Sequence, residues 1–340
     1  MASLSPTILD KISGVRVLVI GDMMLDHYIW GDVHRISPEA PVPVVYAERD
    51  TYTAGGAANV SLNLANLGVS TSILGYCGKD EAGRKLHAIL NKHQVNVLCK
   101  NETEDIPTII KTRVIVRNQQ LCRLDREAKQ SSYCIETAPR FDDILYAALQ
   151  SADAVIISDY AKGVITQSLI DKLQAFSEEN PHILITVDPK PTRQLSYRGA
   201  GLLTPNRNEA LLLAGIPEPY PDHEYPLAEV CSRIHEKYSP NILVITLGAD
   251  GMAVCQEGKV LKHIPTEAKE VFDVSGAGDT VIATITAAMS AGVDIIEAAQ
   301  LANVAAACVV SHVGTVPVVL NELEEKLAKR LAENYAVQPL

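Results

Sequence analysis

The chain of 340 residues is 47% hydrophobic and 21% charged, so it is long and apolar enough to fold around a sizeable core. Acidic residues outnumber basic ones by 41 to 30, and no stretch concentrates Lys and Arg, so nucleic acid is not an expected partner. The seven cysteines are scattered without any C-x-x-C spacing, and no apolar run is suited to span a bilayer. These features predict a cytoplasmic protein with reduced thiols, no zinc site and no membrane contact.

Five short apolar runs predict strands that are buried on both faces, because each is rich in aliphatic residues and is separated from the next by helix-like sequence. They are residues 15–20, 154–158, 183–187, 201–204 and 242–247. Such alternation predicts an α/β fold with a mainly parallel central sheet and helices on both faces. Ligands of these folds collect beyond the carboxyl ends of the strands, where this sequence places polar residues such as Asp22 and Lys190.

Residues 26–53 and 106–127 interrupt this rhythm. They contain alternating patterns, such as Thr108–Val114, that are typical of antiparallel strands with one solvated face. We expect the two segments to pair into a small antiparallel β lid beside the main sheet. Because no repeat, low-complexity tract or long linker divides the chain, residues 1–340 are predicted to form a single domain that carries this lid.

The strongest functional signal is the turn Gly276-Ala277-Gly278, which is followed by Asp279 and a helix-like run to Gly292. Glycines directly before a helix let backbone N–H groups converge, and the helix N-terminus adds partial positive charge, so we expect phosphate to bind here. Phosphoryl transfer also requires a carboxylate that accepts the hydroxyl proton. We therefore predict Asp279 as the catalytic base, with a simple helix cap as the alternative.

Two further elements carry polar groups at helix starts. Gly55 and Gly56 are followed by Asn59, so that small residues let a ligand approach the backbone and an amide can bind its hydroxyl groups. Asn206 and Glu209 follow a predicted strand and share one face of a helical turn, a pair that suits hydrated Mg²⁺. A helix cap is the alternative for this second pair.

Three familiar motifs are absent from the sequence. It has no G-x-x-x-x-G-K-[ST], no G-x-G-x-x-G after the first predicted strand and no G-x-S-x-G. A P-loop enzyme, a dinucleotide-binding fold and an α/β-hydrolase are therefore disfavoured.

In this order, the elements resemble the ribokinase-like (PfkB) carbohydrate kinase family from about Val15 to Pro317. Residues 55–59 are similar to the first signature of that family and residues 273–280 to the second, with the Asn206–Glu209 element between them. Two separate signatures are far more specific than either alone. The resemblance implies a ribokinase-like fold and an ATP-dependent phosphotransferase with an alcohol group as acceptor.

The resemblance also assigns roles to individual residues. Asp279 would be the base and Gly276, Ala277 and Gly278 the anion hole, while Asn206 and Glu209 would hold Mg²⁺ through water. The ATP site would be formed by Lys190, Asn206, Arg207, Asn208, Glu209, Thr246, Gly248, Gly251 and Asn303. The sugar would contact Asp22, Asp26, Gly55, Gly56 and Asn59. Carbonyl groups near Asp273 and Ser275 would hold a monovalent cation such as K⁺.

Within the family, four stretches are similar to the kinase domain of bacterial heptose-phosphate enzymes that make ADP-heptose for lipopolysaccharide. They are residues 21–26, 35–44, 119–126 and 158–163. The implied reaction transfers the ATP γ-phosphoryl group to the anomeric hydroxyl of D-glycero-D-manno-heptose 7-phosphate, giving the β-1,7-bisphosphate. Many relatives continue into a nucleotidyltransferase domain, whereas this sequence stops at Leu340, so adenylylation is expected from a separate protein.

Cations of the lid and its neighbouring loops lead to a hypothesis about specificity. We expect Lys111, Arg113, Arg123 or Lys162 to hold the distal phosphate of the substrate, with Asp125 also at the substrate. The alternative is that these cations lie on solvated strand faces.

An exposed lid edge would invite a second copy of the chain, so a homodimer through the lid is expected. Two other functions stay open at this point. One is another PfkB-type kinase, acting on a sugar such as ribose or fructose or on a nucleoside. The other is a nucleotide- or sugar-binding regulator without catalysis, which the intact turn and Asp279 disfavour.

Overall fold

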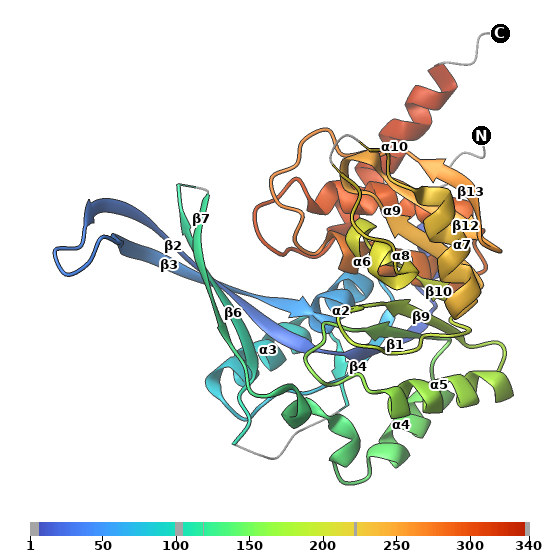
Figure 1. Ribbon diagram of the computed structural model, residues 1–340, viewed down its shortest axis with the longest axis horizontal. Helices are drawn as coiled ribbons and strands as arrows, with labels where there is room; N and C mark the ends of the chain where they lie inside the picture. Colours follow the sequence, from blue (N-terminus) through green and yellow to red (C-terminus); the bar gives the residue numbers. More distant parts are fainter. Residues whose placement is uncertain (1–6, 99–104, 118, 221–222, 337–340) are drawn as a thin grey trace.

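The structure is a computed structural model, which describes residues 7–98, 105–117, 119–220 and 223–336. It contains a nine-stranded main sheet covered by helices and a four-stranded sheet that extends from the body as a long arm (Figure 1). We call the four-stranded sheet the lid sheet. The two sheets meet where β1 of the main sheet (Arg16–Gly21) leads into β2 of the lid sheet (Met23–Ile36).

The main sheet confirms the predicted α/β architecture. Its strand order is β13-β12-β11-β10-β9-β8-β1-β4-β5, parallel from β11 to β5 and antiparallel at β12 and β13. The five predicted strands are the five neighbours at its centre: β11 (Ile242–Thr246), β10 (Leu202–Leu203), β9 (Leu184–Asp188), β8 (Ala154–Ser158) and β1. The strands that the apolar runs did not reveal lie at the two edges: β4 (Ser70–Leu74), β5 (Asn96–Val97), β12 (Met252–Gln256) and β13 (Lys259–Ile264).

Helices cover both faces of the main sheet because its strands are apolar on both sides. In β1, Val17 and Val19 belong to one buried cluster and Leu18 and Ile20 to the other, as the two-residue period of a strand requires. The first cluster includes α1 (Thr7–Ile12), α2 (Ala57–Asn66), α3 (Glu81–Lys92), α8 (Ala277–Ser290), α9 (Ile295–Val309) and α10 (Leu320–Ala336). The second includes α4 (Phe141–Gln150), α5 (Gln167–Glu179), α6 (Arg207–Ala214) and α7 (Leu227–Tyr238).

The lid sheet has the order β3-β2-β6-β7, with β3 at Pro43–Gly56, β6 at Ile109–Val116 and β7 at Gln119–Arg126. Both outer pairs are antiparallel, as expected from the alternating sequence, whereas the central pair of β2 and β6 is parallel. The two hairpins lie far apart in the chain, so their relative direction is set by the body of the protein and was not visible in either segment.

Three short 3₁₀ helices complete the described elements: η1 (Gln130–Tyr133), η2 (Ile135–Thr137) and η3 (Gly248–Asp250). Within the described residues, no helix is both long and apolar enough to cross a membrane. The described cysteines are unpaired thiols, whereas Cys99 lies outside the described residues.

Candidate active site

Asp279 lies in the first turn of α8 and is only 3% exposed. Its carboxylate accepts two hydrogen bonds, from Asn59 Nδ2 at 2.7 Å and from the hydroxyl of Tyr160 at 2.6 Å. Burial raises the pKa of Asp279 to about 6, against the opposing effect of these two hydrogen bonds. The structure thus brings together two predicted site residues that lie 220 positions apart, Asp279 and Asn59. A carboxyl group with this pKa is ionised at neutral pH and can accept a proton.

The turn before Asp279 has the backbone that its glycines predict. Gly276 has a φ of 84°, and an added Cβ would lie 2.8 Å from Asn59 Nδ2, so no other residue fits without strain. A Cβ at Gly278 would have open space around it. No side chain caps the N-terminus of α8; the N–H of Ala277 donates to the carbonyl of Val274 at 3.2 Å, whereas the N–H of Gly278 has no backbone acceptor in the described loop before the helix. An uncapped helix N-terminus of this kind suits an anion, and we call residues 276–278 the anion turn.

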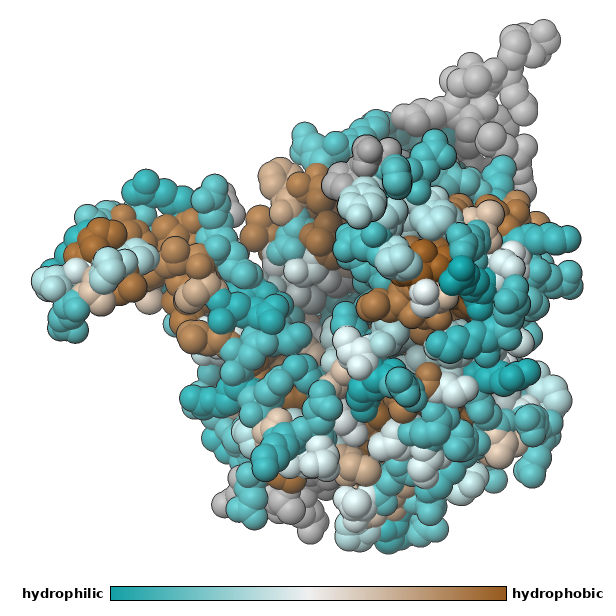
Figure 2. Space-filling model, in the orientation of Figure 1, coloured by the Kyte–Doolittle hydropathy of each residue, from teal (hydrophilic) through white to brown (hydrophobic). Residues whose placement is uncertain are grey.

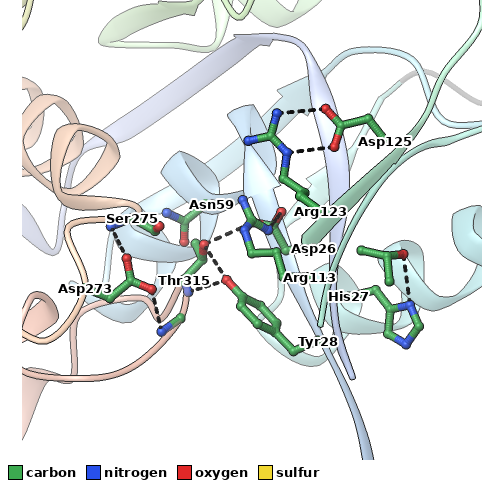
Figure 3. Close-up of polar contacts among 12 residues, drawn as sticks. Asp26, His27, Tyr28, Asn59, Arg113, Arg123, Asp125, Asp273, Ser275 and Thr315 are labelled. Carbon is green, nitrogen blue, oxygen red and sulfur yellow. Dashed lines mark hydrogen bonds and ion pairs between the residues drawn. The ribbon is translucent and has the colours of Figure 1, made fainter. Parts of the chain in front are cut away.

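A buried polar network joins the lid sheet to the loop that precedes α10 (Figure 3). Arg113 donates to Asp26 Oδ1 at 2.6 Å, and Thr315 Oγ1 donates to Asp26 Oδ2 at 3.0 Å. The hydroxyl of Tyr28 accepts from the Thr315 N–H at 2.9 Å. An added Cβ at Gly55 would lie 2.5 Å from Asp26 Oδ2, which explains why this position is glycine. Asp26 and Gly55 therefore lie together at the base of the lid sheet.

Asp22 holds a loop rather than facing an open site. It is fully buried, and its carboxylate accepts the backbone N–H groups of Tyr160, Lys162 and Val164 at 2.9 to 3.0 Å. Its carbonyl would be 2.4 Å from a Cβ at Gly56, whose φ is 59°. The fold itself therefore requires an aspartate at position 22 and a glycine at position 56, whether or not a ligand is bound.

Asn206 and Glu209 form a complete capping box at the start of α6. Asn206 Oδ1 accepts from the N–H of Glu209 at 2.9 Å, and Glu209 Oε2 accepts from the N–H of Asn206 at 3.0 Å. Glu209 Oε1 also accepts from Lys190 Nζ at 2.8 Å. Asn206 and Glu209 therefore do cap the helix, as the alternative prediction stated. The same contacts hold an amide, a carboxylate and an ammonium group close together at the edge of the main sheet.

Asp188, at the end of β9, adds a second, half-buried carboxyl group beside this cluster. Burial, and next the negative charge of Glu209, raise the pKa of Asp188 well above its usual range. Two neighbouring carboxyl groups with one lysine are a charge set that a hydrated divalent cation would neutralise. In the described part of the chain, no three His, Cys, Asp or Glu side chains are arranged as a direct metal cage.

The residues predicted for the remainder of the nucleotide site lie near this edge. Thr246 forms an isolated bridge with Asn206, and Arg207 pairs with Asp250 at 3.3 Å. Asn303 is buried and donates to the carbonyl of Pro265 at 2.6 Å, which ties α9 to the loop after β13. The remaining members are the exposed Asn208 and two glycines with positive φ, Gly248 and Gly251.

Asp273 and Ser275 belong to a loop that is anchored to the segment before α10. The Asp273 carboxylate accepts from the N–H of Ser275 at 2.9 Å and of Gly314 at 3.0 Å (Figure 3). Across the same junction, the N–H of Phe272 donates to the carbonyl of Val310 at 2.8 Å. The anion turn is thus braced from the side of residues 310–315.

The strand register puts the predicted lid cations on one face. Lys111 lies opposite Asp26 on β2 and Asp125 on β7, and Arg113 lies opposite Tyr28 and Arg123. Three of the four predicted cations already have an acidic partner: Arg113 with Asp26, Arg123 with Asp125 and Lys162 with Glu127. Lys111 makes no ion pair with any residue that the structure describes, and burial lowers its pKa. Its ammonium group lies 5.7 Å from the centre of the Tyr160 ring.

Sequence reasoning assigned no individual role to Tyr160, Thr315 or Asp188, although Tyr160 and Asp188 follow two of the predicted central strands, where ligands of such folds collect. Thr315 carried no such signal, because only the tertiary fold brings it to Asp26.

Solved structures with the same fold include ribokinase from Thermotoga maritima, with a TM-score of 0.71, 18% identity, and coverage of 93% of this chain and 99% of that one. Phosphofructokinase-2 from Escherichia coli has a TM-score of 0.74 at 17% identity, with coverage of 93% of this chain and 100% of that one. At such identities the likeness shows the ribokinase-like fold alone.

The sequence model of the pfkB family of carbohydrate kinases matches residues 15–321, and the chain belongs to this family. Among its relatives, the Bifunctional protein HldE of Desulfatibacillum aliphaticivorans is 41% identical over 331 residues, 96% of this chain and 66% of that protein. The protein of the same name from Geobacter sulfurreducens is 43% identical over 306 residues, 88% of this chain and 60% of that protein. This chain thus spans slightly less than two thirds of the length of these relatives.

Proposed function

We propose that the protein is an ATP-dependent kinase of D-glycero-D-manno-heptose 7-phosphate that phosphorylates the anomeric hydroxyl and forms the β-1,7-bisphosphate. The observation that carries the chemistry is the pairing of the buried Asp279 carboxylate with the uncapped N-terminus of α8. The choice of sugar depends on the likeness of residues 35–44 and 158–163 to the heptose-phosphate kinases, and on the HldE relatives. We place this reaction in the synthesis of ADP-heptose for lipopolysaccharide, in the cytoplasm.

In this reaction Asp279 accepts the proton of the anomeric hydroxyl as the hydroxyl oxygen forms its bond to the γ-phosphorus. The bond from the γ-phosphorus to the bridging oxygen breaks, and ADP leaves with that electron pair. The N–H of Gly278 and the positive end of the α8 dipole stabilise the negative charge on the transferred phosphoryl oxygens. Asn59 keeps the carboxylate oriented, and the buried setting excludes water from the reacting atoms.

The expected cofactors, Mg²⁺ and K⁺, fit the charged and polar groups of the site. Asn206 and Glu209, with Asp188 beside them, would hold hydrated Mg²⁺, which neutralises charge on the ATP phosphates. The anchored loop at Asp273 and Ser275 would hold K⁺ through carbonyl groups and so stiffen the anion turn. A phosphofructokinase-2 structure from Escherichia coli with the same fold is described as a complex with potassium. We assign adenylylation to a nucleotidyltransferase outside these 340 residues.

Selectivity for a phosphorylated sugar follows from the lid cations. Lys111 is half-buried, faces the site and has no acidic partner in the described chain, so an incoming phosphate would satisfy its charge. We propose Lys111 as the principal contact of the distal phosphate, with Arg113, Arg123 and Lys162 around it. Asp26 and Asn59 would then receive sugar hydroxyls beneath the lid.

A coupled ADP-release assay tests both the substrate and this contact. The wild-type protein should turn over heptose 7-phosphate far better than heptose, and ³¹P NMR should locate the new ester on the anomeric carbon. Lys111→Met should raise the KM for heptose 7-phosphate by about 10- to 100-fold, because one charge-assisted contact is lost, and leave the KM for ATP unchanged. Arg113→Ala and Lys162→Ala test the neighbouring cations.

Lys85→Met is the matched control, since Lys85 lies on α3, pairs with Glu81 and contacts the ring of Tyr52, which is on the other face of the lid sheet from Lys111. An unchanged KM in Lys111→Met, Arg113→Ala and Lys162→Ala would remove the phosphate assignment. Preferred turnover of ribose, fructose or a nucleoside would indicate another PfkB-type kinase. Absence of ADP release with every sugar would indicate a regulator without catalysis.

We further propose that the protein forms a homodimer through the lid sheet. The face opposite the cations is apolar and bounds a groove of about 540 Å³ lined by Ile29, Val42, Pro43, Val45, Ala47, Val114, Leu121 and Cys122. Figure 2 shows apolar side chains gathered along the arm, and Val42 and Leu121 there are 51% and 45% exposed. The edge strands β3 and β7 also leave backbone groups unpaired within the described sheet, which suits a second copy.

Light scattering of the wild-type protein should therefore give twice the mass of one chain. The Leu121→Asp variant should give the mass of a single chain, because a charge would then lie in the apolar groove. A wild-type protein that stays monomeric at high concentration would contradict the dimer.

A further inference from the structure

Tyr160 has a position that the proposed reaction does not yet use. It follows β8 by two residues, and its hydroxyl donates to Asp279 Oδ1 at 2.6 Å while Asn59 occupies Oδ2. Burial, and next the charge of Asp279, raise the pKa of Tyr160 well above its usual range. The phenol therefore stays protonated and acts as a hydrogen-bond donor to the carboxylate.

The loop that carries Tyr160 is fixed from two sides by buried carboxylates. Asp22 accepts the backbone N–H of Tyr160 itself at 2.9 Å. Asp159 accepts from the N–H of Ala161 at 2.8 Å, from Arg193 at 2.6 Å and from the Tyr197 hydroxyl at 2.7 Å. Ala161 has a φ of 56°, a conformation that costs energy for a residue with a Cβ. These hydrogen bonds hold the loop in a strained conformation and thereby fix the position of the Tyr160 ring.

The charged groups that face Asp279 come from several elements. Asp26 on β2 and Asp188 on β9 are acidic neighbours that disfavour its ionised form, while Lys111 on β6 favours it. Burial is the largest influence and also opposes ionisation. Against these, the hydrogen bonds from Tyr160 and Asn59 are the two strongest effects that keep the pKa of Asp279 down.

We propose that Tyr160 is a positioning residue for phosphoryl transfer, whose phenol O–H orients the Asp279 carboxylate and stabilises its negative charge inside a buried, acidic site. The proposal rests on the function of Asp279 as the base. The ring of Tyr160 also lies against Lys111, so the same side chain borders both the base and the expected distal-phosphate contact. Loss of the hydroxyl alone should therefore alter the pKa and orientation of the Asp279 carboxylate and leave the packing of the Tyr160 ring unchanged.

Tyr160→Phe tests this, because it keeps the ring and removes only the donor. The acidic limb of the kcat/KM profile, expected near pH 6 in the wild type, should move up by about one pH unit, since the ionised form loses a hydrogen bond. The loss of activity should accordingly be larger at pH 6 than at pH 8. In protein labelled with ¹³C at the Asp carboxyl carbons, NMR titration without substrate should show the same upward shift for Asp279.

Tyr146→Phe removes an exposed phenol on α4 and should leave both profiles unchanged. A Tyr160→Phe variant whose rate falls equally at every pH, with no shift in the Asp279 titration, would overturn the inference and leave Tyr160 as a packing residue. Thermal unfolding of the variant shows whether the loop still folds, and the NMR titration decides the question even if turnover is weak. Failure of the underlying function is separate, because Asp279→Asn would then retain turnover whatever Tyr160→Phe does.

Discussion

Asp279→Asn is expected to lower kcat by about 10²- to 10⁴-fold, the usual contribution of a positioned general base. Asparagine keeps the shape of the side chain but cannot accept the proton of the attacking hydroxyl. Because the pKa of Asp279 is about 6, wild-type activity should fall as the pH decreases through that value and the base becomes protonated. The residual activity of the variant should lack this acidic limb. Coupled ADP-release assays across pH 5 to 9 measure both effects.

Asp171→Asn provides the matched control, since Asp171 is an exposed carboxylate on α5 with a local partner in Gln167. Its kinetics should equal those of the wild type. Near-wild-type turnover in Asp279→Asn would remove the residue from the role of base, and the proposed function would lose the observation that carries it.

Arg193→Met is expected to lower the free energy of unfolding by about 3–5 kcal/mol, the range for leaving a buried charge without its partner. The Asp159 carboxylate has no solvent-exposed surface, and Arg193 is 24% exposed and donates to it at 2.6 Å. A second guanidinium N–H of Arg193 donates to the carbonyl of Ile165 at 2.9 Å. Removal of Arg193 would strand the carboxylate beneath the Tyr160 loop, so kcat should fall as well. Urea unfolding followed by circular dichroism measures the change in stability.

Arg233→Met is the control for this prediction, because Arg233 and Glu229 form a half-exposed pair on α7 that is worth about 0.3–0.5 kcal/mol. The double variant Asp159→Asn/Arg193→Met should be more stable than Arg193→Met, since no buried charge is then unpaired. Equal stability of Arg193→Met and the wild type would show that water reaches Asp159.

The centre of the fold was predictable because its signal is local. Each central strand is a short aliphatic run, and burial on both faces permits no other pattern. The missed strand β4, Ser70–Leu74, begins with three hydroxyl residues and so lacks that pattern. Strand β13 lies at the other edge of the sheet and is exposed along its length except at Ile264, so no apolar run buried on both faces marks it in the sequence.

The site was predictable where a backbone conformation demands a particular residue. Gly276 is required by its positive φ and by the approach of Asn59, so its motif was visible in the sequence. Tyr160 was marked only by its place after a predicted strand, and nothing in the sequence indicates that its hydroxyl donates to a carboxylate 119 residues away. The same holds for Lys111, which differs from the other lid cations only by lacking an acidic partner in the described fold.

The parallel pairing of β2 with β6 has a consequence for the order in which the molecule assembles. The two hairpins of the lid sheet are separated by α2, β4, α3 and β5, all of which belong to the body. Their association must close a long loop, and such non-local pairing forms slowly. The arm is thus expected to be completed late, after the first half of the body is in place. Residues 23–56 transplanted alone would be an isolated two-stranded hairpin, which is marginally stable in water.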